Sequence, residues 1–177
     1  MRKFFGLIFK LCGWSIKGEF SHLNKYVIIA APHTSNWDFL LGITVRYITG
    51  LKTNYIGKSS LFKWPIGWFF KATGGAPVDR TGNKKSVDAI VAVFKEHDSF
   101  RLAIAPEGTR KKVAEWRTGF YYIAKGAKVP IVMIALDYAN KEIRISPPFY
   151  TSDDYQKDLN FIKSFYKGVV GKVPANS

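Results

Sequence analysis

The sequence predicts an α/β fold: a single domain with a largely parallel or mixed central sheet flanked by helices, preceded by an amphipathic N-terminal helix. The length of 177 residues suits one domain with a sizeable core. Short apolar runs typical of buried strands alternate with segments of helical periodicity. No repeat and no linker rich in Pro, Gly or Ser follows Glu19. We therefore expect an N-terminal helical unit over residues 1–19 and one domain over residues 20–177.

The N-terminal segment, residues 2–17, has the pattern of an amphipathic helix. Its apolar side chains form a very wide face, and Lys3, Lys10 and Lys17 lie on the narrow remaining stripe. Aromatic residues beside lysine are typical of a helix lying in the plane of a membrane surface, where each lysine contributes about 1 kcal/mol. A helix that covers the core is one alternative. A secretory signal is less favoured, because Lys10 interrupts the apolar stretch and no A-x-A-like site follows.

The next elements are read from apolar runs. Residues 25–31 (KYVIIAA) predict a buried strand, and a helix is expected over residues 35–49. Residues 53–58 and 75–78 predict shorter strands. Between them lies an aromatic segment, residues 60–71 (SLFKWPIGWFFK), which is either part of the core or a membrane-dipping element, since Trp beside Lys is typical of membrane interfaces.

The second half continues the alternation. Between residues 84 and 96, apolar residues recur at i, i+3, i+4 and i+7, which predicts a helix. Because strands and helices alternate, the strands are expected to be mostly parallel, with an antiparallel strand at one edge. The remaining expected elements are a strand over 100–105, a helix over 118–125, a strand over 131–138, an edge strand over 141–145 and a helix from about Asp153 with Tyr155, Leu159, Ile162 and Val169 on one side.

Composition and charge limit the function classes. Lys and Arg number 27 against 13 Asp and Glu, a net charge of +14 that predicts an acidic partner: nucleic acid, an anionic membrane or an acidic carrier protein. The single cysteine, Cys12, excludes an intramolecular disulfide framework. The three histidines are widely spaced, so no metal site is expected. No run of about 18 apolar residues suggests an ordinary membrane-spanning helix.

Polar residues follow three of the expected strands. Residues 32–38 (PHTSNWD) follow the first strand, Asp79 and Arg80 follow the strand near residue 76, and residues 106–110 (PEGTR) follow the strand over 100–105. In open α/β sheets, ligands bind beyond the carboxyl ends of the strands. The sequence therefore predicts a site where these three segments converge.

Within the first segment, His33 and Asp38 form a candidate acid–base pair. Ser35 is an expected helix N-cap, with Asp38 at a capping-box-like spacing. His33 then lies in the preceding turn, where its side chain can meet Asp38. A carboxylate on one imidazole nitrogen leaves the other nitrogen free to act as a base. Alternatively, Asp38 only caps the helix and His33 only fills the turn.

The other two segments contain groups suited to an anion. Arg80 and Arg110 have the planar fork that binds phosphate in a bidentate manner. Gly108 allows the backbone to approach a ligand closely. Glu107 is expected to pair with an arginine and position it. An exposed arginine in a turn is the alternative for Arg80.

These segments resemble the conserved blocks of a known family. Residues 33–38 resemble the H-x4-D signature of the glycerolipid acyltransferases, the lysophosphatidic acid (1-acylglycerol-3-phosphate) acyltransferase family. Residues 75–80 (GAPVDR), 106–110 (PEGTR) and 129–133 (VPIVM) resemble the second, third and fourth blocks, in the same order. The resemblance therefore covers most of the chain.

The resemblance implies a membrane-associated O-acyltransferase without a cofactor. His33 would be the general base that takes a proton from the acceptor hydroxyl, and Asp38 would orient it. The acceptor oxygen would attack the thioester of acyl-CoA or acyl-carrier protein directly. Pro130 would shape the site or the acyl channel. The residues expected to hold the phosphate and glycerol portion of the acceptor are Arg80, Glu107, Gly108, Thr109 and Arg110.

The expected partners are an anionic membrane surface, a lysophospholipid acceptor and an acyl-carrier protein, with the protein peripheral or shallowly embedded at the cytoplasmic face of a membrane. Residues 60–71 would dip into the bilayer and wall the acyl channel. Alternatives are the same chemistry on an amino-lipid or other non-phosphate acceptor, a non-catalytic lipid-binding protein, and a basic nucleic-acid-binding domain. Nucleic acid is not favoured, because no recognised motif for it is present. A serine hydrolase is not favoured, because no G-x-S-x-G elbow occurs.

Overall fold

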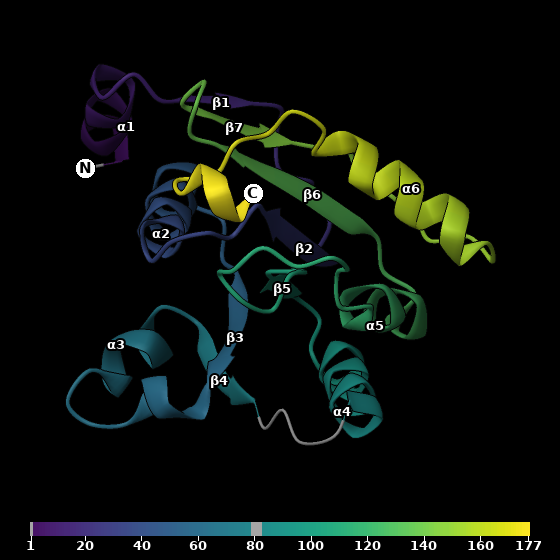
Figure 1. Ribbon diagram of the computed structural model, residues 1–177. Coiled ribbons are helices and arrows are strands. Elements are labelled where there is room, and N and C mark those ends of the chain that lie inside the picture. Colours follow the sequence, from purple (N-terminus) through teal and green to yellow (C-terminus); the bar gives the residue numbers. More distant parts are fainter. Residues whose placement is uncertain (1, 79–82) are drawn as a thin grey trace.

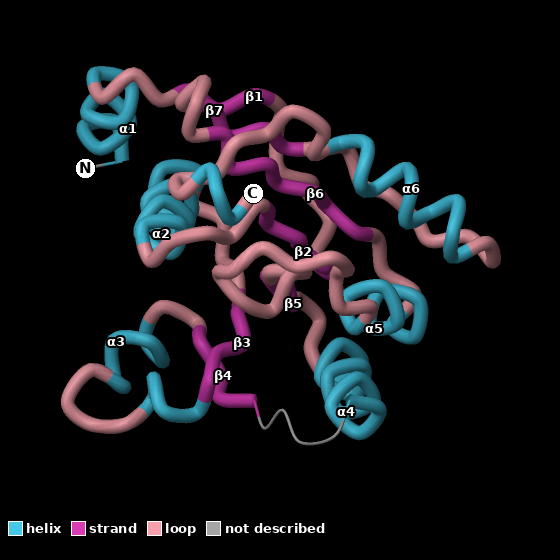
Figure 2. The backbone as a smooth tube through the Cα atoms, viewed as in Figure 1, coloured by secondary structure: helices cyan, strands magenta, loops and turns pink. Residues whose placement is uncertain are grey.

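A mixed sheet runs through the molecule with helices on both faces (Figures 1 and 2), in a computed structural model that describes residues 2–78 and 83–177. In these residues the sheet has seven strands, in the order β1-β7-β6-β2-β5-β3-β4. The strands are β1 (Ser15–Lys17), β2 (Lys25–Ala31), β3 (Asn54–Lys58), β4 (Gly75–Val78), β5 (Phe100–Ile104), β6 (Ile131–Asp137) and β7 (Glu142–Ile145). The helices are α1 (Arg2–Leu11), α2 (Trp37–Thr49), α3 (Gly67–Ala72), α4 (Asn83–Glu96), α5 (Gly119–Ala127) and α6 (Tyr155–Phe165), with 3-10 turns at Ser59–Phe62 and Pro174–Asn176.

The strand directions confirm the predicted class. Every neighbouring pair in the sheet is parallel except β6 and β7, which are antiparallel. The expected edge strand over residues 141–145 is therefore antiparallel, as predicted. It is not the edge, however, because β1 pairs with its outer side.

The N-terminal segment departs from the expected single helix. The helix ends at Leu11, and Gly13 adopts a φ of 83°, which a residue with a side chain rarely adopts. The chain then runs as β1, in which Ser15 pairs with Glu142 of β7. The apolar residues after Gly13 therefore belong to the sheet layer, where Trp14 contacts the ring of Tyr138 at 5.1 Å.

Both faces of the sheet are covered, which explains the unbroken apolar runs of its central strands. In β2, Val27 and Ile29 face the cluster that includes α4, α5 and α6, whereas Tyr26 and Ile28 face the cluster that includes α1 and α2. All four are buried. The alternation of side chains in one strand thus supplies two cores.

Several helices leave apolar side chains in solvent. In α1, Phe9 is buried, but Leu7 and Leu11 are 56% and 77% exposed. The helix packs on α2, where Phe5 contacts Tyr47 edge to face at 5.0 Å. Helices α1, α2 and α3 lie on one side of the molecule (Figure 1). Among the described residues, no helix has the length and hydropathy needed to cross a bilayer.

The aromatic segment over residues 60–71 forms part of a 3-10 turn and most of α3. Phe70 packs against Phe39 and Phe62, with ring centroids 5.5 and 6.1 Å away. Trp64 and Trp68 are instead 92% and 70% exposed. The core interpretation of this segment therefore fits the packing of Phe62 and Phe70, but it does not fit the two tryptophans or Phe69, which is 38% exposed.

The residues after α6 return to the start of α2. The helix ends at Phe165, so Val169, which was expected on its apolar side, lies beyond it. The backbone N–H of Tyr138 donates to the carbonyl of Val170 at 2.8 Å. The N–H of Val173 donates to Oγ1 of Thr34 at 3.1 Å, linking positions 139 residues apart.

Candidate active site

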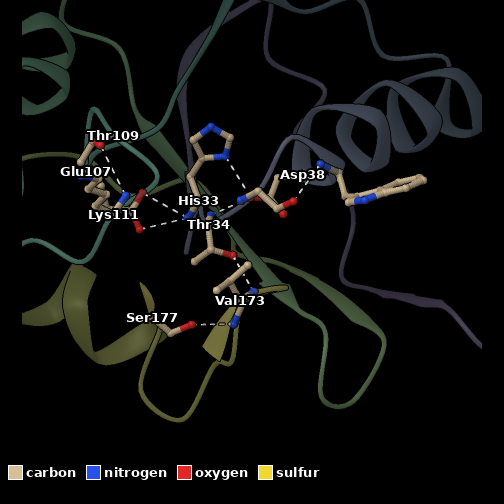
Figure 3. Close-up of polar contacts among 11 residues, drawn as sticks. His33, Thr34, Asp38, Glu107, Thr109, Lys111, Val173 and Ser177 are labelled. Carbon is tan, nitrogen blue, oxygen red and sulfur yellow. Dashed lines mark hydrogen bonds and ion pairs between the residues drawn. The ribbon is translucent and has the colours of Figure 1, made fainter. Parts of the chain in front are cut away.

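The turn after β2 brings His33 and Asp38 together. The distance from Nδ1 of His33 to Oδ2 of Asp38 is 3.1 Å (Figure 3). The helix begins at Trp37 with Asn36, rather than Ser35, at the N-cap position, but the side chain of Asn36 makes no capping bond. The expected capping-box-like contact is present instead between the N–H of Ser35 and Oδ2 of Asp38, at 2.8 Å. The hydroxyl of Ser35 accepts a bond from the N–H of Trp37 at 3.3 Å.

The carboxylate of Asp38 is held by the same turn. Its Oδ2 accepts bonds from the backbone N–H groups of Thr34 and Ser35 at 2.7 and 2.8 Å. Burial raises the pKa of this carboxyl, but the hydrogen bonds from His33, Ser35 and Thr34 outweigh burial, and the net pKa is lowered. Asp38 therefore supports the turn and contacts the imidazole at once, so the two interpretations of this residue hold together.

The imidazole of His33 contacts Asp38 and is partly exposed to solvent. Its side chain is 24% exposed, whereas that of Asp38 is 1% exposed. A carboxylate accepts hydrogen bonds, so the contact favours the tautomer with the proton on Nδ1. The other nitrogen, Nε2, then carries a lone pair that can accept a proton.

Glu107 contacts the backbone of His33 rather than an arginine. Both of its carboxylate oxygens accept from the N–H of His33, at 3.1 and 3.2 Å (Figure 3). It forms no ion pair with any arginine that the structure describes, so the expected pairing is wrong for Arg110, whereas Arg80 lies outside the described residues. Burial raises the pKa of Glu107, although the bond from the His33 N–H opposes this rise. The loop after β5 is thereby fastened to the turn after β2.

The rest of this loop is open to a ligand. Gly108 has a φ of 66°, and a Cβ built on it would lie 2.5 Å from Nε of Arg117. A side chain at this position would strain the backbone and displace the side chain of Arg117. Thr109 and Arg110 are exposed. Arg117, which the sequence did not single out, supplies a second guanidinium beside the loop.

Arg80 and Pro130 complete the set of predicted residues. Arg80 lies outside the described residues. Pro130 precedes β6, and its carbonyl accepts from the N–H of Val27 near the beginning of β2. His33 follows the carboxyl end of β2, whereas Pro130 lies next to the amino ends of β2 and β6. The two residues are therefore at opposite ends of the strands. The expectation that Pro130 shapes the site is therefore wrong.

Tyr138 is a site residue that sequence reasoning missed. Its hydroxyl and Oδ1 of Asp38 are both buried, and neither has a hydrogen bond of normal geometry among the described residues. The two groups nevertheless lie close enough to interact. Burial and the Asp38 carboxylate raise the pKa of Tyr138, and its hydroxyl helps to lower the pKa of Asp38. The missed signal was its position directly after β6, at the same edge of the sheet as His33.

Residues after α6 pack against the turn that carries His33 and Asp38. The hydroxyl of Thr34 accepts from the N–H of Val173, and Gly171 is so close to Thr34 that a Cβ would lie 2.7 Å from its side chain. The N–H of Gly171 donates to the hydroxyl of Ser177 (Figure 3). Thr34 thus connects the turn after β2 to the residues that follow α6.

An apolar pocket of about 700 Å³ lies beside this arrangement. Apolar side chains from α1 and α2 line it together with Tyr138, residues 170–172 and Pro174. No residue of the aromatic segment over 60–71 lines it, so the expectation that this segment walls an acyl channel is not met by this pocket. The pocket meets the candidate site at Tyr138, which faces Asp38.

The arrangement is suited to proton transfer at a solvent-accessible imidazole next to an apolar pocket. A buried carboxylate orients the imidazole and can stabilise it when protonated. In the described residues, no group of three or more His, Cys, Asp or Glu is placed to hold a metal ion.

Comparisons with known proteins show the family and the fold of this chain. A family model described as Acyltransferase matches residues 15–137. A crystal structure of the 1-acyl-sn-glycerophosphate (LPA) acyltransferase PlsC from Thermotoga maritima has a similar fold, with a TM-score of 0.64. The match covers 94% of this chain and 75% of that chain at 17% identity. No curated protein sequence matches.

Proposed function

Because this chain belongs to the Acyltransferase family, we propose that it moves a fatty acyl group from acyl-CoA or acyl-carrier protein to a hydroxyl of a lysophospholipid such as 1-acylglycerol-3-phosphate. The observation that carries the proposal is the 3.1 Å contact between His33 and the buried carboxylate of Asp38. This contact lies in a turn that Glu107 fastens to the PEGTR loop.

In the proposed reaction, His33 acts as general base. Its Nε2 takes the proton of the acceptor hydroxyl while the oxygen attacks the thioester carbonyl carbon, forming a C–O bond and a tetrahedral oxyanion. Collapse of this intermediate breaks the C–S bond, and the imidazolium returns the proton to the departing sulfur. Asp38 stabilises the imidazolium between the two steps.

The acceptor would lie over the PEGTR loop. Thr109 and Arg110 are exposed in this loop. Arg117 brings a further guanidinium next to Gly108. Guanidinium groups favour a phosphate through bidentate bonds, and we propose that Arg80 joins them.

We place the reaction at the cytoplasmic surface of a membrane, with the protein bound peripherally or embedded shallowly. Support comes from α1, α2 and α3, which lie on one side of the molecule (Figure 1) and each have exposed apolar side chains. The apolar pocket opens among α1 and α2 and is large enough for part of an acyl chain. The net charge of +14 favours an anionic lipid surface.

The test is an acyl-transfer assay with the purified full chain. Acyl-CoA and acyl-carrier protein are offered as donors against a panel of lysophospholipids and an amino-lipid. We expect His33→Ala to lower kcat by roughly 10²–10⁴-fold, the usual contribution of a general base. His22→Ala removes an exposed histidine away from the site and is the matched control.

Full activity of His33→Ala, or no transfer to any acceptor, would overturn the proposal. Transfer to the amino-lipid alone would keep the chemistry and replace the acceptor.

A further inference from the structure

A second pocket, of about 450 Å³, lies where strands β3, β4 and β5 begin. Four of its nine lining residues are cationic, namely Arg46, Lys52, Lys71 and Arg101, and none is acidic. Four like charges around one pocket repel one another. An anion in the pocket would relieve that repulsion.

Among the described residues, the four cations of this pocket form no ion pair with a carboxylate. Nη1 of Arg46 donates to the carbonyl of Thr73 at 2.6 Å, and Nε of Arg101 donates to the carbonyl of Leu23 at 3.0 Å. Neutral carbonyls position these guanidinium groups without cancelling their charge. Within residues 2–78 and 83–177, no Asp or Glu lies within 4.0 Å of any of the four charged groups.

This pocket is separate from the candidate active site. Strands β2, β5, β3 and β4 are parallel, and the pocket lies at their amino ends. His33 and Glu107 follow the carboxyl ends of β2 and β5. Strand β5 alone spans roughly 16 Å at about 3.3 Å per residue. The phosphate of a glycerolipid undergoing acylation at His33 therefore does not reach the pocket through its three-carbon backbone.

The surroundings of the pocket favour an anion that belongs to a membrane. Lys71 is part of both the pocket and α3. Trp64 and Trp68, in the same segment, are among the most exposed aromatic side chains. Tryptophan next to lysine is typical of proteins at the lipid headgroup level. A soluble anion would account for the cations but not for these tryptophans.

We propose that this pocket binds the phosphate headgroup of an anionic phospholipid while Trp64 and Trp68 enter the adjoining interface. The inference rests on the membrane association included in the proposed function, but not on the acyl-transfer chemistry. It assigns a specific lipid contact to the neighbourhood of α3. Helices α1, α2 and α3 lie along one side of the molecule, with α1 and α3 at its two ends (Figure 1).

The experiment compares binding of the full chain to vesicles of phosphatidylcholine with and without phosphatidic acid. The variant Lys52→Gln/Lys71→Gln removes two exposed charges of the pocket. The control Lys157→Gln/Lys163→Gln removes two exposed charges from α6, which lies far from α3 in Figure 1. Both variants have the same net charge.

We expect the pocket variant to bind anionic vesicles roughly thirtyfold more weakly than wild type, from the usual contribution of a lysine near anionic lipid. The affinity of the control variant for the same vesicles should differ from that of wild type by less than about threefold. Equal losses in the two variants, or equal binding to both kinds of vesicle, would overturn the inference.

Two further arms separate other sources of the anion. Inorganic phosphate is added as a soluble competitor, and an acyl-carrier protein is offered as an acidic protein. Tight binding of free phosphate without vesicles, or a loss in the pocket variant confined to the carrier protein, would overturn the lipid assignment. Acyl transfer by wild type is measured alongside. Absent transfer with pocket-dependent vesicle binding rejects the proposed function alone, and active transfer with pocket-independent binding rejects the pocket alone.

Discussion

The carboxylate of Asp38 shows how a single residue links local structure to chemistry. Oδ2 is shared by two backbone N–H groups and the imidazole of His33. Oδ1 is buried opposite the hydroxyl of Tyr138, and neither atom has a hydrogen bond of normal geometry among the described residues. Small movements on substrate binding could complete that bond without moving the turn. Tyr138 is therefore a candidate positioning residue for the pair.

Removing the hydroxyl of Tyr138 tests this role. In Tyr138→Phe the ring can keep its contact with Trp14. We expect kcat to fall by roughly fivefold, equivalent to one hydrogen bond of about 1 kcal/mol, with KM and the unfolding temperature unchanged. Steady-state kinetics and thermal unfolding give the two readouts, and Tyr150→Phe, at an exposed tyrosine, is the control. An unchanged kcat would exclude a positioning role.

The raised pKa of Glu107 predicts a pH dependence of stability. Because the pKa of this carboxyl is higher in the folded state than its ordinary value, the unfolded chain loses the proton first as pH rises. Stability associated with protonated Glu107 is therefore complete below about pH 4 and is lost as pH rises through the folded-state pKa. Asp38 has the opposite effect because its pKa is lowered. The stability that its ionised carboxylate contributes is lost as pH falls through its folded-state pKa.

In Glu107→Gln this loss is absent. We expect the free energy of unfolding of wild type, relative to the variant, to decrease between about pH 4 and about pH 7. Urea unfolding at several pH values measures it, with Glu115→Gln, at an exposed glutamate, as the control. A relative stability that rises over this range would show that the sign is wrong.

At the scale of elements, sequence patterns predicted the bounds accurately where turn residues flank a single apolar run. Residues 25–31 and 75–78 form strands with the predicted bounds, because runs of this kind are bounded by turn residues. The N-terminal segment was misjudged because apolar periodicity does not distinguish a helix from a short helix followed by a strand. Gly13, with its positive φ, ends the helix, and pairing with β7 then decides the state of residues 15–17.

The exposed face of α1 gives a prediction for this element. We expect Leu7→Gln/Leu11→Gln to weaken binding to anionic vesicles by more than tenfold, because burial of each leucine in lipid contributes about 1.5–3 kcal/mol. The unfolding temperature should stay the same, since both side chains are largely exposed. Sedimentation with vesicles measures binding, and Leu23→Gln, outside α1, is the control. Undiminished sedimentation would leave α1 without a membrane role.

At the scale of the whole molecule, charge and apolar exposure coincide. The first 75 residues contain 10 basic and 2 acidic residues. They also supply α1, α2 and α3, three helices with exposed apolar side chains that lie on one side of the fold (Figure 1). A polyanion-binding surface needs the charge but not the apolar side chains, so the coincidence favours an anionic bilayer.

This coincidence predicts a partial dependence on salt. Between about 0.1 M and 1 M salt, the screening length falls from about 10 Å to about 3 Å. We expect vesicle binding to weaken strongly over this range but not to vanish, because the apolar contribution remains. Titration with NaCl measures it. Salt-sensitive binding to DNA, without binding to anionic vesicles, would instead support the nucleic-acid alternative.

The sequence by itself determined the α/β class, most of the helices and strands, and the neighbourhood of His33 and Asp38. These features depend on residues close together in the chain, where periodicity and turn geometry act directly. Only the tertiary structure decided that Glu107 binds the His33 backbone across 74 residues and that Val173 reaches Thr34 across 139 residues. It also showed that Tyr138 lies against Asp38 and that Pro130 lies at the amino ends of the strands, away from His33. Such contacts follow from strand order and chain crossings, and these depend on how all the elements pack together.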